Sequence, residues 1–97
     1  MAETYDAETA LGLMKARLNR MRSDASQDEY LRARIAAAAQ RLAENGIVLD
    51  DSPGDTMLLV DMATWDYQNR DRGEAMPEWL REVRRDRWMK EGAARDS

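Results

Sequence analysis

Apolar residues recur along this chain at intervals of three and four positions, the spacing that places them on one face of an α-helix. The most apolar run starts at Met57, and its helical face continues through Leu58, Met62 and Trp65. A polar break at residues 69–73 ends this segment. The pattern predicts a buried helix, a short loop and an amphipathic return helix.

The return helix is predicted to start at Pro77, which suits a first helical turn because it has no amide hydrogen to leave unpaired. Its apolar stripe includes Leu80 and Val83. Trp88 lies off this stripe, so it either folds back over the core with the C-terminus or anchors a partner, since Trp is enriched among interface hot spots. We expect residues 91–97 to form a disordered tail.

Two further helices are predicted earlier in the chain. The first covers about residues 6–22, and its narrow apolar stripe is formed by Leu11, Met14, Leu18 and Met21. Its basic residues gather in the C-terminal half, where they are expected to be solvated and to match the helix dipole, or else to contact phosphate or an acidic partner. These residues are Lys15, Arg17, Arg20 and Arg22.

The second helix is predicted over about residues 27–45. Ser26 and Glu29 have the spacing of an N-terminal capping box, and Gly46 is placed to end the helix in a left-handed conformation. Its buried face is formed by Leu31, Ile35, Ala38, Ala39 and Leu42. Beside that face lies a strip of small residues that lets another helix come close, in the same chain or in a second subunit. The strip consists of Ala33, Ala36 and Ala37.

Residues 46–55 are the only segment without a helical period, and we expect an extended loop there. Its apolar start, residues 47–49, either forms one short strand or pins the loop to the core. The acidic turn that follows lacks the ligand spacing of a calcium-binding loop, so we interpret Asp55 as the cap of the next helix. The predicted fold is therefore a single all-α domain over residues 1–97, with four helices paired as hairpins around one core.

The amino-acid composition excludes several kinds of catalytic and metal-binding site. The 97 residues include no Cys and no His, which removes the thiol nucleophile, the commonest general base and the usual transition-metal ligands. The glycines are too scattered for a phosphate loop, and carboxylates such as Asp61 and Asp66 are expected to face solvent. We therefore expect no enzymatic activity, no cofactor and no metal site.

Charge and hydropathy indicate whether the chain is expected to bind nucleic acid, to be secreted or to enter a membrane. The net charge is −4, and the basic residues are spread over several helices, which argues against a nucleic-acid-reading domain. The N-terminus lacks the features of a signal peptide, and no apolar segment reaches the ~18 residues of a membrane span. We expect a product that is soluble and cytosolic when made and that contacts no membrane.

Several short patterns over residues 11–88 are shared with a known family. They are Asp28-x-x-Leu31-x-x-x-Ile35-x-x-Ala38, Asn45-Gly46-Ile47 before an acidic loop, the apolar helix of residues 57–67, Tyr67-x-x-Arg70, and Met76-Pro77-x-x-Leu80. In these features the chain resembles the small helical head–tail connectors of long-tailed bacteriophages, also described as head-completion or portal-adaptor proteins.

The resemblance implies a structural virion protein at the head–tail junction. Such proteins assemble about a dozen copies into a ring with cyclic symmetry beneath the portal protein. The ring extends the DNA channel and presents a platform to the next head-completion or tail protein. DNA passes through it without sequence-specific binding.

The resemblance also implies contact residues. A C-terminal segment would dock to the portal, and the candidates are Arg84, Arg85, Arg87 and Trp88. Subunit contacts would involve the small-residue strip and the loop. The candidates are Ala33, Ala36, Ala37, Ile47, Leu49, Asp50 and Asp51.

A ring needs two different, complementary patches on each subunit. An acidic region (Asp50, Asp51, Asp55) and a basic region (Arg81, Arg84, Arg85, Arg87) are candidates for them. The alternative, from another class, is a small cytosolic helical interaction module of regulatory or antitoxin type, which predicts a dimer with a defined partner and no ring.

Overall fold

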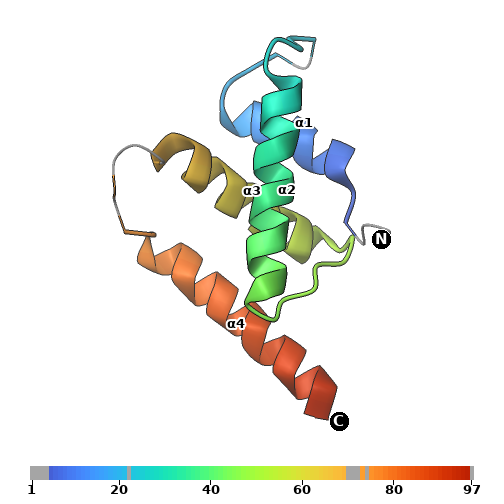
Figure 1. Ribbon diagram of the computed structural model, residues 1–97, viewed down its shortest axis with the longest axis vertical. Coiled ribbons are helices and arrows are strands. Elements are labelled where there is room, and N and C mark those ends of the chain that lie inside the picture. The colour runs from blue at the N-terminus through green and yellow to red at the C-terminus, as the bar shows by residue number, and fades with distance from the viewer. Residues whose placement is uncertain (1–4, 22, 70–72, 74, 97) are drawn as a thin grey trace.

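A computed structural model describes residues 5–21, 23–69, 73 and 75–96, with side chains described as far as residue 92. It contains four helices, and no strand occurs among these residues. The helices are α1 (Ala7–Arg17), α2 (Asp28–Glu44), α3 (Pro53–Asn69) and α4 (Glu78–Asp96) (Figure 1). The all-α, four-helix prediction is confirmed.

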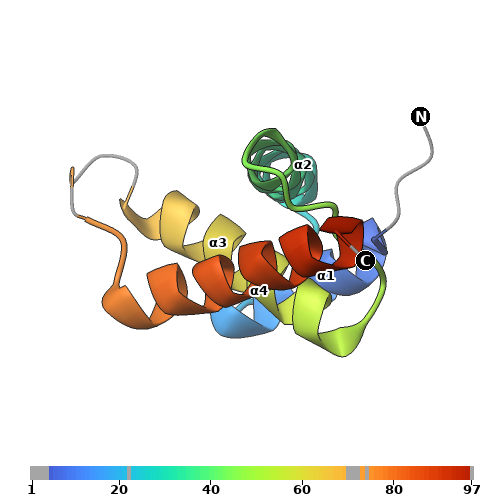
Figure 2. The same cartoon turned by 90° about the horizontal axis from the view of Figure 1, so that it is seen from below.

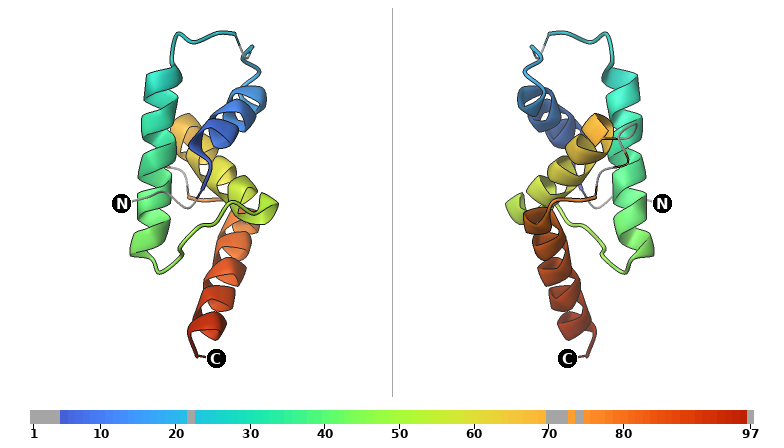
Figure 3. Two further views of the ribbon diagram at one scale, coloured as in Figure 1. Left: turned by 90° about the vertical axis from the view of Figure 1, so that its right-hand side faces the viewer. Right: turned by 90° about the vertical axis from the view of Figure 1, so that its left-hand side faces the viewer.

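Helix α3 lies at the centre of the fold and packs against each of the other three helices, while α1 and α2 also contact each other. In the described part of the chain, α4 packs against α3 alone among the helices. Figure 2, seen from below, shows α4 crossing in front of α3 with α2 end-on beside it, and Figure 3 shows its C-terminal half extending past the other helices. Much of the surface of α4 therefore has no other described helix packed against it.

The core is built from the periodic apolar positions of all four helices, because these are the positions that face inward when the helices cross α3. Ile47 and Leu49 add to it from the loop between α2 and α3, and both side chains are buried. The fully buried larger side chains include Met14, Leu31, Ile35, Leu42, Leu58, Leu59, Met62 and Leu80. The apolar start of the loop thus pins it to the core without forming a strand.

Helix α1 is shorter than predicted. Asp6 begins it, and its carboxylate accepts hydrogen bonds from the amides of Glu8 (3.1 Å) and Thr9 (3.2 Å). The helix ends at Arg17, and Asn19 adopts a left-handed conformation (φ 59°), which turns the chain away. The predicted stripe therefore stops before Met21, whose side chain is 73% exposed.

The predicted cap of α2 is wrong at its start and correct at its end. Ser26 donates its amide and hydroxyl hydrogens to Asp24, 3.1 and 2.7 Å away, and Gln27 begins the helix without a side-chain cap. Gly46 has a φ of 90° after the last turn, the conformation expected of a residue that ends a helix.

Helices α3 and α4 each depart from the prediction in detail. The Ser52 hydroxyl, and not Asp55, accepts an amide at the start of α3, from Asp55 itself at 3.3 Å. In α4, Val83 lies off the core and is 44% exposed. Residues 91–96, expected as a disordered tail, continue α4, and Ser97 lies outside the described residues.

Candidate interaction surface on the last helix

Arg87 fixes the middle of α4 to the start of α3. Its guanidinium binds the Asp55 carboxylate at two points, Nε to Oδ1 at 2.7 Å and Nη2 to Oδ2 at 3.1 Å. The same group donates to the Val48 carbonyl oxygen (2.8 Å) and to Glu91 Oε2 (2.7 Å). Asp55 Oδ2 also accepts the Asp50 amide at 2.9 Å, so one ionic cluster joins α4, α3 and the loop.

This cluster is largely removed from solvent, since the side chains of Arg87 and Asp55 are 13% and 7% exposed. Hydrogen bonds from Arg87 to Asp55, and then to Glu91, raise the pKa of the Arg87 guanidinium against the effect of desolvation. Arg87 was predicted to dock to the portal and Asp55 to belong to an acidic patch. Their side chains instead satisfy each other inside the subunit, and neither is presented to a partner.

The cations that the structure describes in the first three helices and their loops are all paired with carboxylates, most of them because packed helices bring opposite charges together and one, Arg20–Asp24, because the two residues are four positions apart in the loop. The pairs are Lys15–Asp28, Arg17–Asp61, Arg20–Asp24, Arg32–Glu8, and Arg34 and Arg41 with Asp66. The basic cluster of α1, predicted to be solvated, includes the buried Lys15 at 2.9 Å from Asp28. Asp61 and Asp66 are likewise half-buried partners of arginines and do not face open solvent.

The cations of α4 behave differently. Arg81, Arg84, Arg85 and Lys90 form no ion pair with any residue that the structure describes. Three of them share one face with Trp88, because Arg81, Arg84, Arg85 and Trp88 are spaced i, i+3, i+4 and i+7. We call these four residues the basic face of α4. Trp88 is 49% exposed on it, so the C-terminus does not fold this ring over the core.

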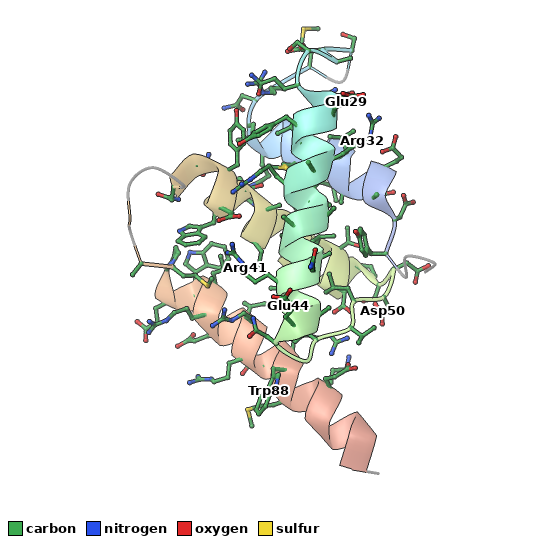
Figure 4. The ribbon with its side chains drawn as sticks, viewed as in Figure 1. Glu29, Arg32, Arg41, Glu44, Asp50 and Trp88 are labelled. Carbon is green, nitrogen blue, oxygen red and sulfur yellow. The ribbon has the colours of Figure 1, made fainter. Side chains whose placement is uncertain are left out.

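A groove runs between the basic face of α4 and the end of α2. Its volume is about 630 Å³, and Asn45 and Ile47 form the opposite wall. Glu78 and Glu82 also line it, so its charge is mixed but with more arginines than glutamates. In Figure 4, Trp88 lies on α4 just beneath the last turn of α2 (Figure 4). A half-exposed aromatic ring beside unpaired guanidinium groups is typical of protein-binding surfaces.

The second exposed surface is the loop before α3 with the first turn of that helix. Val48, Asp50, Asp51 and Met57 are exposed there, and we call them the acidic knob. Hydrogen bonds from the side chain and amide of Ser52 lower the pKa of Asp50, which keeps this carboxylate ionised. Asp51 forms no ion pair or hydrogen bond with the described residues.

Some of the predicted subunit-contact residues are buried and others are exposed. Ile47 and Leu49 are core residues, so their side chains are not free to face another subunit, although Ile47 borders the groove. Asp50 and Asp51 are exposed in the acidic knob. The small-residue strip is exposed along α2, and no helix in the described part of the chain covers it. The strip consists of Ala33, Ala36 and Ala37.

Arg81 was predicted as part of the basic ring-contact region but not among the portal-docking residues. Its position seven residues before Trp88 places both on one helical face, and that spacing was the available signal. Asn45, which forms the opposite wall together with the predicted contact residue Ile47, had no such signal, because this wall depends on where α4 lies relative to the end of α2.

Comparisons of the chain with protein-family models, with curated proteins and with solved structures found no match. Among the described residues, no group of His, Cys, Asp or Glu is arranged to hold a metal ion. None of the described helices is both long and apolar enough to cross a membrane.

Proposed function

We propose that this chain is a structural subunit of the head–tail junction of a tailed bacteriophage or prophage. In this proposal it forms a ring, docks to the portal protein, extends the DNA channel and offers a platform for tail attachment. The sequence features over residues 11–88 support the family, and the open basic face of α4 supports docking. The single observation that carries the proposal is this face, where unpaired arginines surround a half-exposed Trp88.

Arginines without an ion pair are common on protein surfaces, but in the described part of this chain they are confined to α4. The described cations of α1, α2 and the loops form ion pairs with carboxylates within the subunit, whereas three arginines of α4 line one groove and form no ion pair with a described residue. A guanidinium group beside an exposed indole gains most when a partner excludes water from both. The last helix is therefore the part of this subunit that is best suited to bind another protein.

The arrangement of α4 supports docking in a second way. Because α4 packs against α3 alone among the described helices, none of these helices covers the basic face. The cluster around Arg87 fixes the helix in place, so a partner would meet a preformed surface, and less conformational entropy would be lost on binding.

The first test is the mass of the protein in solution by light scattering over a wide concentration range, alone and with the portal protein, together with negative-stain microscopy. Rings of many subunits, free or on the portal, are the expected result. A tight dimer that is independent of concentration and does not bind the portal would contradict the proposal and favour the small interaction module. A monomer that fails to bind the portal would also contradict it.

Three variants, one of them a matched control, make the portal test specific. Trp88→Ala and Arg85→Glu alter the basic face, while Lys90→Glu changes an unpaired cation of the same helix outside the groove. The first two variants should weaken assembly or docking, and Lys90→Glu should leave both close to the wild type. Equal behaviour of all three would remove the observation on which the proposal rests.

A further inference from the structure

We infer that the groove beside the basic face of α4 receives the acidic knob of a second copy of this chain. This inference rests on the proposed function, because a ring uses two different surfaces of each subunit. The sequence offers Arg84 and Arg85 both to the portal and to a ring contact, and it offers Trp88 to the portal. Here this face belongs to the ring contact, so that the portal would bind a different surface of the ring.

Charge complementarity is the first argument. The groove offers the guanidinium groups of Arg81, Arg84 and Arg85, none of which has a carboxylate partner among the described residues. The acidic knob offers Asp50, whose pKa is lowered by hydrogen bonds from Ser52, and Asp51, which has no ion pair among the described residues. The two surfaces are therefore oppositely charged, which favours contact between copies and opposes contact between like surfaces.

Apolar surface is the second argument. Trp88 is 49% exposed at the groove, and Val48 and Met57 are 57% and 42% exposed at the acidic knob. A flexible Met side chain and a branched Val can cover an indole ring, and methionine sulfur makes favourable contacts with aromatic edges. Each surface thus carries an apolar centre beside charges of one dominant sign, as protein interfaces commonly do.

Rigidity of the acidic knob is the third argument. The Val48 carbonyl oxygen is held by Arg87, and the Asp50 amide is held by Asp55, so the loop backbone is fixed from both sides. Leu49 between them is buried in the core. The exposed side chains of the knob are consequently presented on a fixed backbone, which reduces the entropy lost when they enter a groove.

The surfaces are adjacent but distinct on one subunit, on either side of the ionic cluster. In Figure 4, Asp50 lies beside the lower end of α2 and Trp88 lies below that end. Because Arg87 contacts both Val48 and Asp55, the same cluster fixes the position of the knob relative to α4. The angle between successive subunits would then be set within each subunit.

A charge-exchange experiment tests this contact. The groove variant carries Arg81→Glu and Arg85→Glu, and the knob variant carries Asp51→Lys; Asp50 is left unchanged because it accepts the Ser52 amide at 2.9 Å. Each variant alone should associate more than about tenfold more weakly than the wild type, since like charges would meet. An equimolar mixture should recover assembly, because each groove then meets a knob of opposite charge.

Controls separate this result from a folding defect or a general charge effect. Circular dichroism should show the same helical content and thermal midpoint for all variants within a few degrees. Lys90→Glu and Glu29→Lys change exposed charges outside both surfaces and should leave association unchanged. If the wild type assembles only on the portal, the same set is measured on portal-bound rings.

The outcomes also distinguish this inference from the proposed function. Rings that persist in both variants, or that are not recovered by mixing, overturn the inference while leaving the ring in place. A groove variant that still forms rings but no longer binds the portal assigns the groove to the portal and likewise overturns it. A wild-type protein that never assembles, alone or on the portal, overturns the proposed function itself.

Discussion

Replacing Arg87 with methionine is the perturbation that best tests how α4 is held. Methionine keeps most of the aliphatic length of the side chain but removes the guanidinium group, which makes two hydrogen bonds to Asp55, one to Glu91 and one to the Val48 carbonyl. Asp55 would then keep only the Asp50 amide as a donor in a site where its side chain is 7% exposed.

The expected cost follows from the carboxylate that is left behind. Removing one partner of a buried ion pair destabilises a protein by about 3–5 kcal/mol, and the residual amide bond and partial exposure of this pair place Arg87→Met near the lower end, at about 3 kcal/mol. For a domain of this size that loss lowers the thermal midpoint by roughly 15 °C. The double variant Asp55→Asn/Arg87→Met should recover about 1–2 kcal/mol, because no unpaired charge is left.

Urea unfolding followed by tryptophan fluorescence measures these free energies, and amide hydrogen exchange shows where the loss occurs. In Arg87→Met, the amides of α4 should exchange faster relative to those of α2, because α4 packs against α3 alone among the described helices. The matched control is Lys90→Met, an exposed and unpaired cation of the same helix, expected to change stability by less than about 0.5 kcal/mol. If Arg87→Met costs no more than Lys90→Met, the ionic cluster does not hold α4.

Three further changes have definite expected outcomes. Thr64→Val should raise the free energy of unfolding, measured in urea, by about 0.5–1 kcal/mol. The buried Thr64 hydroxyl has no hydrogen-bond partner among the described residues, and valine has the same shape. A loss of stability would show that the hydroxyl is hydrogen-bonded. Asp6→Ala should shorten α1 and cost about 1 kcal/mol, as loss of an N-cap does, and an unchanged melting curve would contradict the cap. The pKa of Asp50 is lowered from 3.8 in the folded state, so its contribution to stability is present above pH 3.8 and is lost as the pH falls through the folded pKa. The stability difference between the wild type and Asp50→Asn should therefore shrink below pH 3.8, and a difference that is constant down to acid unfolding would refute this assignment.

Much of the helix pattern was predictable because it depends on local spacing. The periodic apolar positions of α2 and α3 are the buried ones, and Gly46 ends α2 as its sequence position indicates. The prediction failed where local signals compete. Ser26 has the spacing of a capping box but bonds Asp24 instead, and α1 stops at Arg17 although apolar residues continue beyond it.

Ion pairing was the part of the surface that sequence could not assign. Arg87 and Arg85 are two residues apart on the same helix, yet one is fixed to Asp55 and the other is exposed in the groove. Local spacing cannot separate them, because the partner of Arg87 lies 32 residues earlier in the chain. The structure leaves Arg85 exposed and without an ion pair to any described residue, whereas Arg87 is fixed inside the subunit. Docking of this segment to the portal stays a prediction.

The sequence by itself determined the four helices and the core, because apolar periodicity acts over a few residues and each helix must bury the stripe it carries. Its lack of Cys and His also limited the chemistry that any fold of this chain could perform. Only the tertiary structure decided which charged side chains form ion pairs inside the subunit and which stay exposed on its surface. Pairing depends on the distance between groups that are remote in sequence, and that distance is set by how α1, α2 and α4 cross α3.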